Sequence, residues 1–188
     1  VQANSLHFNC EVSYTEIQNE IYFSQLEIKR YEEKFNFPKP FSIIQPNSKL
    51  TFTPNKQWDI VNFQKVVDHR SDIFWIQVGN HGEFLLKNVN DYRSRTSLRE
   101  LFFIVSKSQF VLANEGLINH IASAFNVKSY VLLSGFSDRS LANYRNSVFF
   151  ESQDSCSNSP CWLLKECGVN GKPCLSNIDS KIVAYQLS

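Results

Sequence analysis

The sequence predicts an α/β fold: a Rossmann-like, doubly wound parallel sheet. Between residues 41 and 150, apolar runs alternate with segments of helical periodicity, which is the pattern of strands connected by helices. The clearest unit begins with the apolar run 110–113, which stops at Asn114-Glu115-Gly116. It is followed by a helix-compatible segment to Ala124 and a second apolar run, 127–133. We interpret this unit as strand, turn, helix and strand, with parallel strands whose turns lie at the carboxyl edge of the sheet.

The segment that precedes this pattern is expected to be a linker helix. In residues 11–35, apolar side chains recur at helical spacing with Glu and Lys between them. The run Phe37-Pro38-Lys39-Pro40 ends the helix, because proline disfavours helix both at its own position and at the residue before it. We therefore divide the chain into a linker segment, 1–40, a Rossmann-like domain, 41–152, and a Cys-rich tail with a closing helix, 153–188.

Each further element of the domain has its own local signal. Ser97 and Glu100 have the spacing of a capping box, so a helix is expected to begin at Leu98. The near-continuous apolar run 73–78 predicts a buried strand that ends before Gly79. By the same criteria we expect strands at 41–45, 73–78, 89–92, 110–113, 127–133 and 147–150, and helices at 58–67, at 98–106, from the Gly116 turn to 124, and at 179–187.

Composition limits the classes of function. The chain has 188 residues and a net charge of +1 with both signs interspersed, so nothing indicates an extended electrostatic footprint for DNA or RNA. No apolar run approaches the length of about 20 residues that a membrane span needs, and no signal-peptide pattern opens the chain. We expect a cytoplasmic location, with association at the inner face of the membrane left open. Because the chain begins at Val1 and contains no Met, we interpret it as processed or, more in keeping with residues 1–40, as a piece of a longer protein.

Four of the five cysteines are concentrated in the tail. Cys156, Cys161, Cys167 and Cys174 follow the spacing C-x4-C-x5-C-x6-C, whereas Cys10 stands alone. In a reducing compartment four close thiols suit a structural zinc or iron ion, and this loop-rich segment has too little apolar periodicity to order itself by burial. Two disulfides and four free thiols are the alternatives that the spacing leaves open. We expect the metal to bind through these four residues, in a structural role, with Cys10 free.

A polar loop is the first candidate for ligand binding. The chain contains neither the GxGxxG of dinucleotide-binding folds nor a P-loop. The loop 47–56 instead carries three hydroxyl residues together with Lys49 and Lys56, a combination that suits a diphosphate. A solvated surface loop has the same kind of composition, so the residues alone leave both interpretations open.

The turn after residue 113 is the second candidate. Glu115, Gly116, Asn119 and His120 lie at this turn or on the first helical turn that follows it. In open α/β sheets ligands bind outside the carboxyl edge, often against a helix N-terminus that offers free N–H groups. The residues alone also allow structural roles, with Glu115 as an acid that stabilises the helix N-terminus and His120 as a core histidine.

Several motifs, taken in order, resemble one known family. The stretches PNSKLTFTPNKQW, IFWIQVG and TSLRELFFIVSKSQFVLANEGLINHIASAFNVKSYVLLSG are similar to the heptosyltransferase-type glycosyltransferases, family 9, and the Cys-rich tail resembles an ending found in part of that family. The resemblance covers residues 41–178. It implies a GT-B enzyme with two Rossmann-like domains that face each other across a cleft. This chain is similar to the C-terminal, nucleotide-sugar-binding half, and the N-terminal half would hold the acceptor and the catalytic carboxylate.

The resemblance also implies roles for residues of the two loops. Ser48 and Lys56, with Lys49 beside them, fall where the family contacts the donor diphosphate, and Glu115 falls at the acidic position near the transferred sugar. The other matches are Gly116 and Leu117 as backbone N–H donors to phosphate, His120 as the family histidine, and Glu83 as an acid that binds the nucleotide ribose. Glu115 replaces the family's usual Asp, and Gly116-Leu117 replaces a Ser/Thr-Gly pair, so the sugar itself is left open.

These matches imply an inverting sugar transfer. A base must deprotonate the acceptor hydroxyl, and cations or N–H dipoles must stabilise the charge on the departing diphosphate. Lys56 and the helix N-terminus at Gly116 meet the second need, so no catalytic cofactor is expected; Glu115 is a candidate for the base, which we expect instead in the N-terminal acceptor domain. The expected partners are a nucleotide-diphosphate sugar and a glycan, lipopolysaccharide, lipid-linked or protein acceptor. The alternatives are a non-catalytic nucleotide-sugar-binding module and a metal-stabilised interaction domain.

Overall fold

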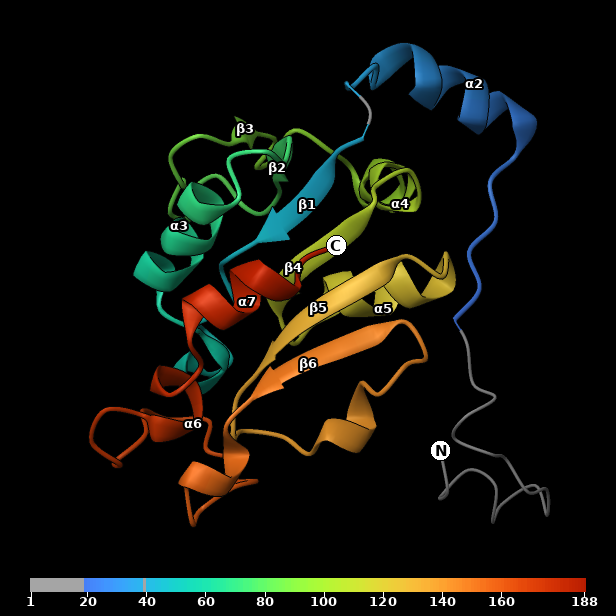
Figure 1. The fold of residues 1–188 in the computed structure, drawn as a ribbon. Coiled ribbons are helices and arrows are strands. Elements are labelled where there is room, and N and C mark those ends of the chain that lie inside the picture. Colours follow the sequence, from blue (N-terminus) through green and yellow to red (C-terminus); the bar gives the residue numbers. More distant parts are fainter. Residues whose placement is uncertain (1–18, 39) are drawn as a thin grey trace, which may run out of the picture.

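A six-stranded parallel sheet forms the centre of the molecule in the computed structural model, which describes residues 19–38 and 40–188 (Figure 1). The strand order is β3-β2-β1-β4-β5-β6, and every pairing is parallel. This is the doubly wound order of dinucleotide-binding sheets, and it changes direction between β1 and β4. The predicted fold class is therefore confirmed. The strands are β1 (Ser42–Gln45), β2 (Trp75–Gln77), β3 (Asn90–Asp91), β4 (Phe110–Asn114), β5 (Lys128–Leu133) and β6 (Ser147–Glu151).

Helices cover both faces of the sheet. Helices α3 (Ile60–His69) and α7 (Ser180–Gln186) lie on one face, and α4 (Leu98–Ser106) and α5 (Leu117–Ala124) lie on the other (Figure 1). Helix α2 (Gln25–Lys34) packs outside α4. The shorter helical pieces are η1 (Pro54–Lys56), η2 (Arg139–Leu141), η3 (Gln153–Ser155) and α6 (Pro173–Ser176). No helix in the described part of the chain combines the length and apolarity needed to cross a bilayer.

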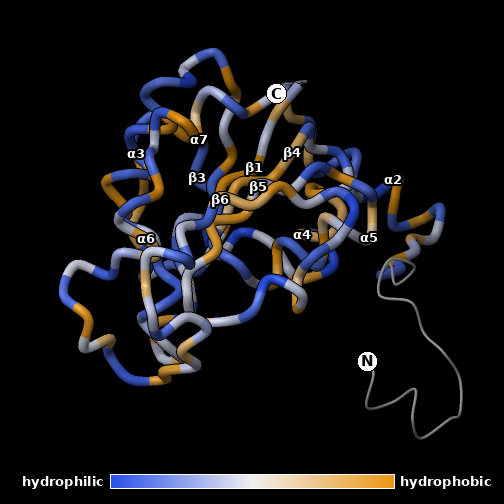
Figure 2. Tube along the Cα trace, turned by 60° about the horizontal axis from the view of Figure 1, so that its bottom comes forward, coloured by the Kyte–Doolittle hydropathy of each residue, from blue (hydrophilic) through white to orange (hydrophobic). Residues whose placement is uncertain are grey.

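Alternate side chains of the strands enter two separate cores. Ile44 and Leu112 point to the core beneath α3 and α7, whereas their neighbours Ile43 and Val111 point to the core beneath α4 and α5. Because successive strand residues face opposite sides, a strand covered on both faces must be apolar throughout. Figure 2 shows the hydrophobic strands at the centre of the molecule. This explains why the central strands β1, β2, β4 and β5 are largely apolar runs in the sequence, unlike the edge strand β3 (Asn90–Asp91).

The helix boundaries follow local capping. Helix α4 begins at Leu98 as predicted, and Ser97 and Glu100 form the capping box. Helix α3 begins at Ile60, two residues later than predicted, because the Asp59 carboxylate accepts a hydrogen bond from the backbone N–H of Val61. Trp58 therefore belongs to the preceding loop, where it is completely buried.

The helix predicted at 11–35 is shorter in the structure. Residues 19–24 are not helical, and α2 begins at Gln25 because Ser24 and Glu27 form a capping box. Residues 11–18 lie outside the described part of the chain. Tyr31 is buried in the core beneath α4, and the Lys34 ammonium lies 2.6 Å from the Glu100 carboxylate. Helix α2 therefore packs against the domain through both apolar and ionic contacts.

One side chain fixes both ends of the long connection from β1 to α3. Asn114, at the carboxyl end of β4, is only 5% exposed. Its Nδ2 donates to the carbonyl oxygen of Pro46 at 2.7 Å, and its Oδ1 accepts from the backbone N–H of Trp58 at 2.9 Å. The loop 46–58 leaves β1 and reaches α3 between these two contacts, so its path is set by the neighbouring strand.

We expect Asn114→Ala to destabilise the protein by about 1–3 kcal/mol, because the buried backbone N–H of Trp58 loses its partner, whereas the Pro46 carbonyl oxygen keeps its hydrogen bond from Gln57. Urea unfolding followed by circular dichroism measures this change. Asn62→Ala is the matched control, because in the part of the chain that the structure describes the one hydrogen bond of the Asn62 side chain comes from Lys65 on the same helix, and the substitution should change stability by less than about 0.5 kcal/mol. Equal effects of the two substitutions would contradict the role assigned to Asn114.

Candidate functional site

The loops that leave β1 and β4 enclose a cavity of about 220 Å³ at the carboxyl edge of the sheet. This is the point where the strand order reverses, which is where open α/β sheets bind ligands. The cavity brings together most of the residues predicted from sequence: Ser48, Lys49, Lys56, Glu115, Gly116 and Leu117. Its other lining residues are Gln45, Asn47, Phe52, Thr53 and Asn114.

An ion pair between Lys56 and Glu115 lies in this cavity. The Lys56 ammonium contacts the Glu115 carboxylate, and the two side chains are only 19% and 11% exposed. The Ser137 hydroxyl donates to the same carboxylate at 3.3 Å. The ammonium also lies 5.0 Å from the ring centroid of Phe136 and 5.9 Å from that of Phe52. A cation held between a carboxylate and two aromatic faces is well positioned to receive an anionic ligand.

The N-terminus of α5 opens beside this ion pair. Gly116 is the N-cap and gives no side-chain hydrogen bond, whereas α2, α3, α4 and α7 each have a side-chain cap. The uncapped first turn therefore offers backbone N–H groups and the positive end of the helix dipole. A Cβ added at Gly116 would meet no protein atom nearer than 4.0 Å. The protein itself does not require glycine here, but a ligand that approaches the backbone closely would.

The loop after β1 is ordered from within. Gln57 accepts from the Ser48 backbone N–H at 2.7 Å and donates to the carbonyl oxygen of Pro46 at 2.6 Å. The Ser48 hydroxyl is buried and has no hydrogen-bond partner among the described residues. A buried hydroxyl on a cavity wall normally has a partner, so this group is available to a ligand oxygen.

Glu83 lies in the connection from β2 to β3, outside the cavity lining. One carboxylate oxygen accepts from Asn80 at 3.0 Å, and the other is buried without a partner in the described structure. This connection contacts the loop after β1, because Asn47 donates to the carbonyl oxygen of Phe84 at 3.3 Å. Glu83 is therefore near the edge of the site, next to a wall residue, but not in it.

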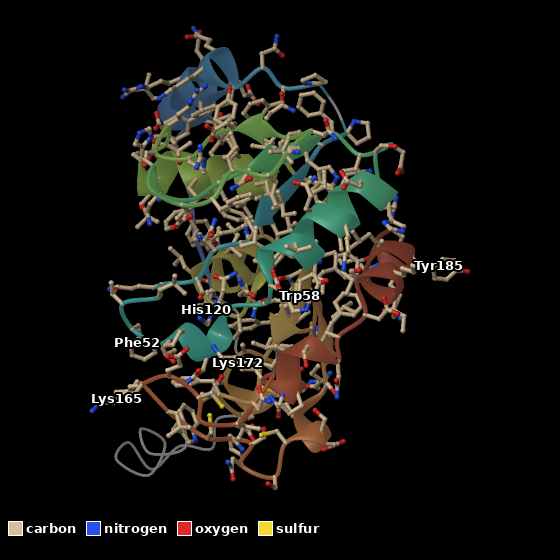
Figure 3. The ribbon with its side chains drawn as sticks, turned by 90° about the vertical axis from the view of Figure 1, so that its left-hand side faces the viewer. Phe52, Trp58, His120, Lys165, Lys172 and Tyr185 are labelled. Carbon is tan, nitrogen blue, oxygen red and sulfur yellow. The ribbon has the colours of Figure 1, made fainter. Side chains whose placement is uncertain are left out.

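His120 also lies outside the cavity lining, although it is on the first turn of α5. Its Nδ1 is 2.7 Å from the Tyr144 hydroxyl, and its ring packs edge-on against the Tyr144 ring. Figure 3 labels His120 together with Phe52, which does line the cavity. In this arrangement His120 supports the connection from β5 to β6.

Sequence reasoning missed three aromatic and polar residues at the site. Phe52 lies within the predicted loop 47–56, but an apolar side chain in a polar loop gives no signal of a role in ligand binding. Phe136 and Ser137 follow β5 directly, so the rule that ligands bind at the carboxyl edge applied to them as well. Their contacts with Lys56 and Glu115 depend on the fold of the turn, which has no local sequence signal.

The four clustered cysteines line one small cavity of about 20 Å³. They are Cys156, Cys161, Cys167 and Cys174, and all four are unpaired thiols. Burial raises the pKa of the Cys174 thiol. Within residues 19–38 and 40–188, no group of three or more His, Cys, Asp or Glu side chains is arranged closely enough to hold a metal ion. The fold thus gathers the four predicted ligands without closing them into a coordination site.

Asn55 joins the Cys-rich segment to the candidate site. Its Nδ2 donates to the carbonyl oxygens of Leu163 and Lys165, each at 2.7 Å, and its Oδ1 accepts from the Cys167 backbone N–H at 3.2 Å. Asn55 is buried and directly precedes Lys56. Two neighbouring residues of η1 therefore have different roles: Lys56 places its ammonium in the cavity, and Asn55 binds backbone groups of the Cys-rich segment.

A larger cavity, of about 710 Å³, lies between the start of α3 and residues 166–176. The first turn of α3 is already capped there by Asp59, whose carboxylate accepts from Val61 at 2.9 Å. Neither β4 nor the turn that follows it contributes to the lining of this cavity. We place the site at the smaller cavity because the ion pair, the uncapped helix and the free hydroxyl converge there.

Known proteins share this fold. No family model matches the chain, and no curated protein matches its sequence. Among solved structures, ADP-heptose LPS heptosyltransferase II of E. coli is similar with a TM-score of 0.65 and 13% identity, over 88% of this chain and 51% of the other. A family 9 glycosyltransferase of Veillonella parvula has a TM-score of 0.67 and 14% identity, over 89% and 52%. The iron-containing dodecameric heptosyltransferase TibC, in complex with ADP-D-beta-D-heptose, has a TM-score of 0.62 and 13% identity, over 78% and 43%.

These similarities establish the fold. The resemblance to family 9 glycosyltransferases that the motifs predicted is confirmed at the level of three-dimensional structure. The chain spans about half the length of the solved structures that it matches.

Proposed function

We propose that this chain is the donor half of a GT-B glycosyltransferase, which binds a nucleotide-diphosphate sugar for inverting transfer to a glycan, lipopolysaccharide or protein acceptor. The observation that carries this proposal is the convergence of Lys56 and the uncapped N-terminus of α5 in one cavity. Together they form a site for a diphosphate that needs no metal ion. The similar structures include one with ADP-heptose bound, which supports a nucleotide-sugar ligand.

The chemistry assigns separate tasks to the residues of the site. The acceptor hydroxyl oxygen attacks the anomeric carbon, and the bond from that carbon to the diphosphate oxygen breaks on the opposite face. The electron pair of that bond goes to the diphosphate, whose growing charge is stabilised by Lys56, the Ser48 hydroxyl and the N–H groups of Gly116 and Leu117. The hydroxyl proton goes to a base that we assign to a second, acceptor-binding domain.

The ion pair changes partners in this scheme. In the structure Lys56 is paired with Glu115, whereas a bound diphosphate would take over the ammonium. The released Glu115 carboxylate, beside Ser137, is then free to accept hydrogen bonds from hydroxyls of the transferred sugar. Glu83 would bind the ribose at the edge of the site, beside the wall formed by Asn47. The role of His120 in this proposal is to support the site from behind, through Tyr144.

We expect Lys56→Ala to weaken binding of a nucleotide-diphosphate sugar by about 1.5–3 kcal/mol, the range for a charge-assisted hydrogen bond. Titration calorimetry with ADP-heptose measures the change, with UDP and GDP sugars as comparisons. Lys65→Ala is the matched control, because the Lys65 side chain is exposed on α3 and its one hydrogen bond to a described residue goes to Asn62. An unchanged affinity in Lys56→Ala would remove Lys56 from the site.

We also expect the 188-residue chain to bind the donor without transferring its sugar, because the acceptor site and base belong to the second domain. Incubation with nucleotide sugar and acceptor, followed by mass spectrometry of the products, tests this. Turnover by the chain alone would make Glu115 the leading candidate for the base. Binding that remains unproductive when an acceptor-binding domain is supplied would favour the non-catalytic nucleotide-sugar-binding module.

We also propose that the Cys-rich segment binds a structural zinc or iron ion. Four thiols that line one cavity offer the soft donor set that suits either metal, and binding of the ion would draw them together into a tetrahedral site. Cys156, Cys161, Cys167 and Cys174 would hold the ion, whose role would be to pin the Cys-rich segment to the domain. The iron content of the similar TibC structures supports this proposal.

Elemental analysis of protein purified without chelator should give about one zinc or iron ion per chain. Cys161→Ser should lose most of the metal, while Cys10→Ser, the matched control far from the Cys-rich segment in the sequence, should retain it. A metal-free protein whose mass is lower by four hydrogens would mean two disulfides and would refute the metal site.

A further inference from the structure

Two half-exposed aromatic side chains lie close to the candidate site, Phe52 in the cavity lining and Trp162 one ring further out, beyond Phe136. Phe52 and Trp162 are each 51% exposed, and both pack against the buried Phe136, with ring centroids 5.9 Å and 5.6 Å from its own. Phe52 lines the cavity, and Phe136 lies against the Lys56 ammonium. The three rings come from three separate segments: the loop after β1, the turn after β5 and the Cys-rich segment. Together they form a platform, here called the aromatic platform, next to the ion pair.

The position of Trp162 is fixed by its backbone. Its N–H donates to the carbonyl oxygen of Phe136 at 3.0 Å, and the N–H of Cys161 donates to that of Gly135 at 2.9 Å. Its φ of +51° lies in the left-handed region, which bulky residues rarely adopt. The surrounding structure therefore imposes this conformation, because an unconstrained loop would adopt a more favourable φ. The indole is thereby held half-exposed next to Phe136.

The chemistry around the platform matches a sugar ring. The face of an aromatic ring carries negative charge and attracts the partly positive C–H groups on one face of a pyranose. The neighbouring Glu115 carboxylate and Ser137 hydroxyl are hydrogen-bonding partners for sugar hydroxyls. The platform lies on the β5 side of the cavity, opposite the β2 side where Glu83 would take the ribose. The nucleobase is therefore expected away from it.

We propose that Phe52 and Trp162 bind the apolar face of a sugar ring at the mouth of the cavity. The proposal rests on the proposed function, since it places the sugar beside the diphosphate site. Two sources supply this chemistry: the sugar of the donor, and the acceptor sugar that receives it. The aromatic platform is then the part of the site that distinguishes a nucleotide sugar, or a nucleotide with acceptor, from the nucleotide alone.

Tryptophan fluorescence reports on this platform directly. The chain has three tryptophans, and Trp58 and Trp75 are completely buried, so Trp162 is the one that acrylamide can reach. If the donor sugar stacks here, ADP-heptose should protect Trp162 from acrylamide quenching, while ADP should not. If the acceptor sugar stacks here, protection should appear with methyl heptoside or methyl glucoside in the presence of ADP. Absence of protection by any of these sugars would overturn the proposal.

Substitutions provide an independent readout. For a donor sugar, Trp162→Ala should weaken ADP-heptose about 3- to 10-fold and leave the affinity for ADP unchanged. Trp162→Phe should restore most of the loss, which keeps the test valid if the alanine variant folds poorly. Tyr185→Ala is the matched control, because Tyr185 is 91% exposed on α7 and points into solvent away from the cavity (Figure 3). If the platform binds the acceptor sugar, Trp162→Ala should weaken binding of the methyl glycoside by the same factor and leave the affinity for ADP-heptose unchanged.

Three outcomes separate this proposal from the proposed function. If wild-type protein binds neither ADP nor ADP-heptose, the donor site fails, and the glycoside titrations still decide the platform. If ADP binds but no sugar protects Trp162, the platform fails and the diphosphate site stands. If Trp162→Ala lowers the affinities for ADP and ADP-heptose equally, Trp162 contacts the nucleotide and the platform proposal is overturned. If the tryptophan emission shifts with protein concentration alone, Trp162 contacts another protein surface, which also overturns the platform proposal.

Discussion

The two hydrogen bonds of the Asn114 side chain are the constraint on which the candidate site depends. They tie Pro46 and Trp58, the two ends of the loop after β1, to the end of β4. Strand pairing fixes β4 relative to β1, so the loop inherits its position from the register of the sheet. Lys56 can therefore meet Glu115, which lies 59 positions further along the chain, without a metal or a disulfide between them. In a flexible loop of this length, the conformational entropy lost on ordering would oppose the contact between Lys56 and Glu115.

The ion pair gives the mostly buried Lys56 side chain a partner of opposite charge. An ammonium that loses water needs a compensating charge, and Glu115 supplies it while no ligand is bound. Contacts with the rings of Phe52 and Phe136 add to this stabilisation. In the proposed function a diphosphate, which carries more charge than one carboxylate, would replace Glu115 as the partner. The desolvation of Lys56 would then have occurred already during folding and would not oppose binding.

The sequence was informative wherever the cause of a structure is local. The capping-box spacing of Ser97 and Glu100 predicted the start of α4, and apolar runs predicted the strands that are covered on both faces. Position at a carboxyl edge identified the cavity residues Lys56 and Glu115 before any coordinates. The prediction was weakest where long-range packing decides, as for the ring of His120, which turns to Tyr144, and for Trp162, whose segment is placed by contacts with distant residues.

Asn55 and Lys56 are neighbours on one short 3-10 turn, yet they serve different regions. The first holds backbone groups of the Cys-rich segment, and the second faces the cavity. Two equilibria that order the same turn are thermodynamically linked, and the coupling between them is reciprocal. If a metal ion or disulfides were to cross-link the thiols, this turn would lose freedom before the proposed ligand arrives at Lys56, and the ligand would in turn stabilise the cross-linked state. The affinity of a site that contains no cysteine would then depend on the redox state and metal supply of its surroundings.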